Sequence, residues 1–109
     1  MDIEKRQSLR KQLRIKAMLT VDGRMPMKVN TIDIGKFGMC LNGVLYSLDP
    51  GQAVGVAFQM VCSGKIYDVA ANARISHCTS TINDGFKAGL QFVNLDSEVA
   101  AMLAQYVGT

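Results

Sequence analysis

Three arginines near the start of the chain have the type and spacing to bind an anion. Arg6, Arg10 and Arg14 are each four residues apart, so they would share one face of a helix or form a basic arm if the segment is extended. A guanidinium group donates two parallel hydrogen bonds to phosphate oxygens and can also stack on a purine, which an ammonium does less well. The segment therefore predicts an anionic, aromatic ligand such as a nucleotide, unless its charges only keep the chain soluble.

The second candidate element is the glycine-containing turn from Asp33 to Gly38, with the sequence DIGKFG. Its glycines, Gly35 and Gly38, allow positive φ angles or a close approach between backbone and ligand. The carboxylate of Asp33 can accept hydrogen bonds from the N–H groups of a guanine edge, or it can orient a neighbouring arginine. By itself this pattern is an ordinary turn, so its interpretation depends on the arginines.

The sequence lacks the motifs that are typical of enzymes. It has no nucleophile elbow, no zinc-protease motif, no phosphate-binding loop and no close pair of carboxylates on one predicted face. The single histidine, His77, falls on the apolar side of its predicted strand, where packing is the simpler explanation. The cysteines are odd in number and far apart, at positions 40, 62 and 78. We therefore expect no metal, no cofactor, no disulfide framework and no catalysis.

Length and charge narrow the class of protein further. The 109 residues fit one domain, and six of the twelve basic residues lie within the first sixteen positions, which concentrates positive potential at one end. No apolar run is long enough to span a bilayer, and the charged N-terminus does not resemble a signal peptide. We therefore expect no membrane span and a cytoplasmic location, which unpaired cysteines would suit.

Most of the chain alternates apolar and polar residues with the period of a β-strand. The predicted strands cover residues 13–21, 27–34, 39–41, 52–62, 67–76 and 86–92. After Asp96, which has the side chain of an N-cap, apolar residues recur at helical spacing and predict a helix of about three turns. Six short strands followed by one helix predict a small antiparallel barrel or sandwich, with the helix over an open side.

Together, RxxxR at 6–10 and DxGxxG at 33–38 resemble the PilZ domain family, whose signature is RxxxR followed after one hairpin by [DN]xSxxG. The stretches TIDIGKFGMCL and FKAGLQFVNLD resemble strands of that family too, so the likeness covers nearly the whole chain. The resemblance implies an all-β fold, a six-stranded antiparallel split barrel with a C-terminal α-helix. We expect one domain over 1–109, with a basic arm at 1–12, the barrel at 13–93 and the helix at 96–107.

The resemblance also implies binding of cyclic di-GMP, a bacterial second messenger. Carried over by position, the ligand-binding roles fall to Arg6, Arg10, Arg14, Asp33, Gly35 and Gly38, with Arg14 as an auxiliary phosphate contact. Nucleotide binding would order the arginine arm on the barrel and alter a surface that an effector protein contacts. Arg10 and Arg14 form a second RxxxR, so the register 10/14 stays open beside 6/10. We favour 6/10, because the separation of Arg10 from Asp33 leaves room for a complete first hairpin.

Two other functions compete with this one. Gly35 stands where the family has a serine, and the missing hydroxyl would cost about 0.5–1.5 kcal/mol if it made a typical hydrogen bond. The chain would then be an adaptor that no longer binds nucleotide and acts by protein–protein interaction in pilus or flagellar machinery. A general nucleic-acid binder is disfavoured by the absence of Trp, by 6% aromatic residues and by cations gathered at one terminus. We expect cyclic di-GMP and an effector protein as partners, no nucleic acid, and a monomer or homodimer.

Overall fold

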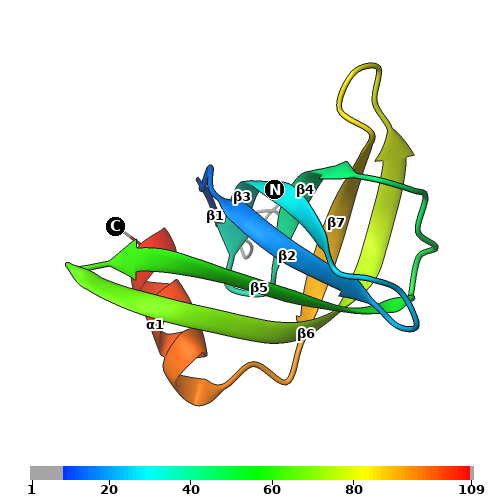
Figure 1. Ribbon diagram of the computed structural model, residues 1–109. Helices are drawn as coiled ribbons and strands as arrows, with labels where there is room; N and C mark the ends of the chain where they lie inside the picture. Colours follow the sequence, from blue (N-terminus) through cyan, green and yellow to red (C-terminus); the bar gives the residue numbers. More distant parts are fainter. Residues whose placement is uncertain (1–8, 109) are drawn as a thin grey trace, which may run out of the picture.

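The computed structural model describes residues 9–108. They form a closed, six-stranded antiparallel β-barrel with a helix after the last strand (Figure 1). The elements are β1 (Arg10–Gln12), β2 (Lys16–Val21), β3 (Met27–Gly35), β4 (Gly38–Val44), β5 (Ala53–Cys62), β6 (Lys65–Ser80), β7 (Phe86–Val93) and α1 (Ser97–Val107). The predicted all-β barrel with a C-terminal helix is therefore confirmed.

Six of the seven strands form the wall of the barrel. In spatial order they are β3, β2, β5, β6, β7 and β4, and β4 pairs with β3 to close the ring. β1 also pairs with β3, beyond the end of β2, so β1 and β2 are two parts of one interrupted strand. At the interruption, the hydroxyl of Thr31 accepts a hydrogen bond from the backbone N–H of Ile15 at 2.9 Å and donates one to the carbonyl of Leu13. This buried side chain thus replaces the missing ladder bonds.

The core follows from the alternation in the sequence. Along β5, every second residue from Val54 to Cys62 is buried, and the residues between them face outward. Leu19 of β2 is completely buried, and so are Met39 and Leu41 of β4. Because the ring is closed, the inward side chains of all six strands share one apolar interior.

A β-bulge in β6 changes the direction of His77. Ile75 pairs with Leu90 and His77 pairs with Gly89, so Ser76 is an extra residue in the ladder. One extra residue reverses which face the following side chains take. His77 is exposed, and the prediction that it lies on the apolar side of its strand is wrong.

The C-terminal helix α1 begins where the sequence predicted. The carboxylate of Asp96 accepts hydrogen bonds from the backbone N–H groups of Glu98 and Val99, at 3.1 and 3.4 Å, which satisfies N–H groups that a helix start leaves unpaired. Met102 and Leu103 are buried in the core, and the helix packs against β1, β3 and β5. α1 thus covers the barrel at the ends of these strands (Figure 1). No helix in residues 9–108 is long and apolar enough to cross a membrane.

Candidate functional site

Strand β1 brings the two candidate motifs together. In its register with β3, Arg10 lies opposite Gly35 and Gln12 lies opposite Asp33. The Nε and Nη2 atoms of Arg10 donate hydrogen bonds to Oδ1 of Asp33, at 3.0 and 2.7 Å. The two side chains are 38% and 32% exposed, so the pair contributes only about 0.2–1 kcal/mol to stability. An ion pair that stabilises the fold so little leaves both groups available for a ligand.

The arginine segment is extended where the structure describes it. Residues 10–12, which sequence reasoning placed in the basic arm, form β1, so the alternative of a helix is wrong for this part of the segment. Arg6 lies outside the described residues. Arg14 follows β1 at the interruption of the strand and is exposed. Of the two registers, only 10/14 has both arginines within the described chain.

The two motif glycines are needed for close packing of the chain against itself. Neither Gly35 nor Gly38 has a positive φ angle, so of the two expected roles the positive φ angle does not apply. A Cβ atom on Gly35 would lie 2.7 Å from the carbonyl oxygen of Leu9, and one on Gly38 would overlap the carbonyl oxygen of Leu90. At both positions the glycine therefore makes room for neighbouring backbone. At Gly35 this is the backbone of Leu9, the residue before β1, and at Gly38 it is the backbone of strand β7.

A pocket of about 350 Å³ adjoins Arg14 on β2, β3 and β4. It is lined by Arg14, Ile15, Lys16, Asn30, Thr31 and Asn42. Sequence reasoning missed Lys16, Asn30 and Asn42 as site residues. The signal available was that Lys16 lies on the polar face of the predicted first strand. No sequence pattern gives the register that aligns Lys16, Asn30 and Asn42 across β2, β3 and β4.

Cys40 lies on β4 directly across from Asp33, and it is buried. Burial, with a smaller contribution from the Asp33 carboxylate, raises the pKa of the Cys40 thiol above its usual value, although Lys87 and Arg10 act in the opposite direction. The thiol is therefore protonated at neutral pH. The thiolate is the reactive form, so this shift makes Cys40 a weaker nucleophile.

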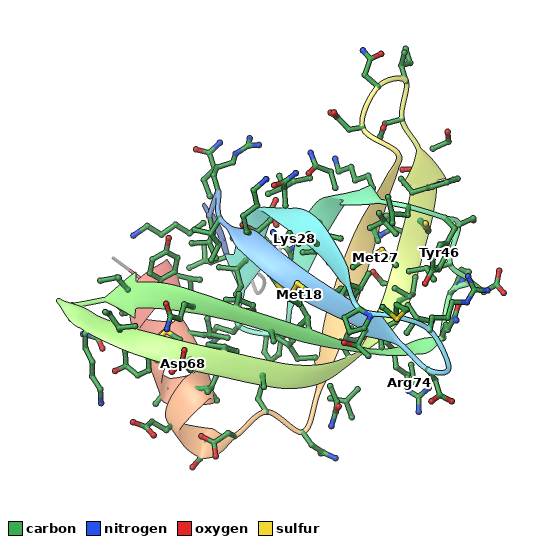
Figure 2. All side chains as sticks on the ribbon, in the orientation of Figure 1. Met18, Met27, Lys28, Tyr46, Asp68 and Arg74 are labelled. Atoms are coloured by element: carbon green, nitrogen blue, oxygen red, sulfur yellow. The ribbon has the colours of Figure 1, made fainter. Side chains whose placement is uncertain are left out.

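Two other polar side chains take no part in this arrangement. Arg74 donates a hydrogen bond to the carbonyl of Gly51 at 3.0 Å, and Figure 2 shows it well away from the N-terminal strand. His77 pairs in register with Gly89, and its ring lies where a Cβ of that glycine would be. Within residues 9–108, no three His, Cys, Asp or Glu side chains gather in a way that could hold a metal ion.

The chemistry of the site is that of binding. Three cations lie on one short segment of the chain, at Arg10, Arg14 and Lys16. Asp33 adds a carboxylate that accepts hydrogen bonds. Such a set suits a ligand that carries phosphates together with N–H donors. A purine nucleotide has both.

Known proteins share features of this sequence and this fold. The family model described as "PilZ domain" matches residues 4–108, whereas no protein with a curated description matches the sequence. The inhibitor of motility MotI/DgrA from Bacillus subtilis superposes with a TM-score of 0.82 at 13% identity, over 96% of this chain and 50% of that one. The present chain thus spans half the length of that protein.

Two further structures contain the nucleotide that the sequence suggested. The PilZ domain of YcgR from Escherichia coli, with c-di-GMP, has a TM-score of 0.70 at 12% identity, over 95% of this chain and 89% of that one. The PlzA protein of Borreliella burgdorferi, in complex with c-di-GMP, has a TM-score of 0.60 at 14% identity, over 98% and 38% of the two chains. At these identities the likeness establishes the fold.

Proposed function

This chain belongs to the PilZ domain family, and on that premise we propose that it is a receptor for cyclic di-GMP without catalytic activity. The observation that carries the proposal is the contact between Arg10 and Asp33. These residues are 23 positions apart in the sequence, yet the guanidinium and the carboxylate lie 2.7 Å from each other. One comes from the RxxxR element and the other from the turn that the family resemblance assigns to the nucleotide.

The proposed mechanism uses the modest strength of that contact. The side chains of Arg10 and Asp33 are both about one-third exposed. The guanidinium can therefore donate hydrogen bonds to a phosphate, while the carboxylate accepts hydrogen bonds from the N–H edge of a guanine. Two or three charge-assisted hydrogen bonds, at about 1.5–3 kcal/mol each, exceed what the exposed ion pair contributes. In this mechanism binding brings Arg6, which precedes β1, to the ligand and changes a surface that an effector protein contacts.

Calorimetric titration with cyclic di-GMP tests the proposal. We expect Arg6→Ala and Arg10→Ala each to abolish measurable binding, because each removes a guanidinium from the ligand. Thermal stability of Arg10→Ala should change by less than about 1 kcal/mol, since the exposed pair contributes so little to folding.

A matched control comes from the opposite end of β3. The guanidinium of Arg24 lies 4.2 Å from the ring centroid of Tyr46, and Arg24→Ala removes the same charge without touching the Arg10–Asp33 site. Binding in that variant should stay at the wild-type level. Wild-type affinity in both Arg6→Ala and Arg10→Ala would refute the assignment. A steep loss of affinity with rising salt would instead indicate a general nucleic-acid binder.

An adaptor that does not bind nucleotide is the second candidate function. Gly35 favours it, because the hydroxyl of the family serine is missing and the backbone carbonyl of Leu9 lies close to where that side chain would begin. The similarity to the inhibitor of motility MotI/DgrA fits a regulator of the motility machinery. In this case wild-type protein would show no heat of binding with cyclic di-GMP, and its partner would be a protein.

A further inference from the structure

The pocket beside Arg14 lies next to the Arg10–Asp33 pair. Across the strands, Lys16 of β2 is opposite Asn30 of β3, and Asn30 is opposite Asn42 of β4. Residues that are opposite each other in neighbouring strands project to the same side of the sheet. Asn30 and Asp33 are three positions apart on β3, or about 10 Å along the strand. The two places are thus close enough for one dinucleotide to reach both.

The charge of the pocket is positive. Arg14 and Lys16 both line it, and no carboxylate does. Within the described part of the chain, the guanidinium of Arg14 makes no hydrogen bond or ion pair. The ammonium of Lys16 donates one hydrogen bond, to Oδ1 of Asn30 at 2.8 Å, and both groups are exposed. Two cations without a neighbouring anion favour a phosphate at this place.

Asn42 adds a hydrogen-bond acceptor that has no donor. Its Oδ1 atom is shielded from solvent and accepts no hydrogen bond within residues 9–108. A buried acceptor without a partner destabilises the fold, so such atoms are rare and call for an explanation. Asn42 lines the pocket, so a turn of its side chain toward the pocket would let an N–H group of a ligand satisfy this oxygen. Guanine has adjacent N1–H and N2–H₂ donors on one edge, which match an amide oxygen.

We infer that this pocket is the second half of the dinucleotide site. Arg14 and Lys16 hold a phosphate there, and Oδ1 of Asn42 accepts a hydrogen bond from a guanine. The inference rests on the proposed function, and it adds Lys16 and Asn42 to the residues that the motifs identify. It also gives Arg14 a phosphate contact of its own, in addition to the contacts of Arg6 and Arg10 in the proposed function.

Two substitutions test the inference by titration with cyclic di-GMP at about 0.15 M salt, where charges further apart than about 8 Å are largely screened. Lys16→Met removes the ammonium and keeps the length of an exposed side chain, so it should weaken binding about 10- to 100-fold. Asn42→Leu replaces the unpartnered amide by an apolar side chain of similar size. It should weaken binding about tenfold without lowering the thermal midpoint, because no hydrogen bond of the free protein is lost.

The control is Lys28→Met, on the same strand as Asn30. Lys28 is exposed on the outer surface (Figure 2) and does not line the pocket, so this variant should bind like the wild type. If Lys16→Met and Asn42→Leu bind like the wild type while Arg10→Ala does not, the inference is overturned and the proposed function stands. An equal loss in Lys28→Met also overturns it, because the effect would then be general electrostatics. If the wild type itself does not bind, the proposed function fails and the inference fails with it.

Discussion

Adding a single methyl group at Gly35 is expected to push β1 away from β3. The new Cβ would lie 2.7 Å from the carbonyl oxygen of Leu9, whereas ordinary contacts begin at 3.4 Å, so the two must separate by 0.7 Å. The atom it meets is backbone, which cannot rotate away as a side chain would. Overpacking of this kind destabilises the fold by about 1–3 kcal/mol. Alanine also lowers the conformational entropy of the unfolded chain, which stabilises the fold by about 0.4–1 kcal/mol. We expect Gly35→Ala to lower the free energy of unfolding by about 1–2 kcal/mol.

Thermal unfolding and amide exchange measure this effect. A loss of about 1 kcal/mol lowers the midpoint of a domain of this size by about 4–8 °C. The amide of Leu13, which donates to the carbonyl of Ile32 at 3.0 Å, should exchange faster because it lies at the end of the displaced strand. Gly35→Ser carries the same Cβ atom and should lose as much stability, so the family hydroxyl can be restored only if β1 moves.

Gly55 on β5 is the matched control for this substitution. A Cβ on Gly55 would meet nothing closer than 3.9 Å, from the Cβ of Thr20, so Gly55→Ala should be neutral or stabilising by up to about 1 kcal/mol. Equal stability of Gly35→Ala and Gly55→Ala, with unchanged exchange at Leu13, would refute the reasoning. Such a result would mean that Leu9 does not lie close enough to Gly35 for a Cβ atom there to clash with its carbonyl oxygen.

Two further substitutions test the elements that hold the site in place. Thr31→Val keeps the shape of a buried side chain but removes the hydroxyl between Leu13 and Ile15, so urea unfolding should show a loss of about 1–3 kcal/mol; an equal loss in the exposed Thr20→Val would contradict this explanation. Asp96→Ala removes the cap of α1 and should cost about 1 kcal/mol in thermal unfolding, whereas Asp96→Asn should retain nearly all the stability. Should the asparagine variant lose as much as the alanine variant, the capping hydrogen bonds are not the cause.

Local patterns in the sequence were sufficient for most of the elements. The alternation of residues 52–62 predicted β5, and Ser63 and Gly64 both adopt the positive φ angles of a two-residue hairpin turn. Asp96 caps the helix as expected. These features depend on residues within a few positions of one another, so the printed sequence contains all the information that they need.

The bulges and the site could not be predicted in the same way. The extra residue at Ser76 turned His77 outward, and the hydroxyl of Thr31 replaces ladder bonds at the interruption between β1 and β2. Each depends on how a strand is aligned with a partner far along the chain. A shift of one residue reverses the faces of a strand, so alternation alone cannot report it.

By itself, the sequence determined which side chains face the core in the regular parts of the strands, where the chain turns, and that arginines precede a glycine-containing turn. Only the tertiary structure decided that Arg10 meets Asp33, that Gly35 makes room for the residue before β1, and that Lys16 and Asn42 border the same pocket. The physical reason is that barrel closure fixes the register of all six strands together. The neighbours of a side chain across strands are set by that closure and not by its neighbours along the chain.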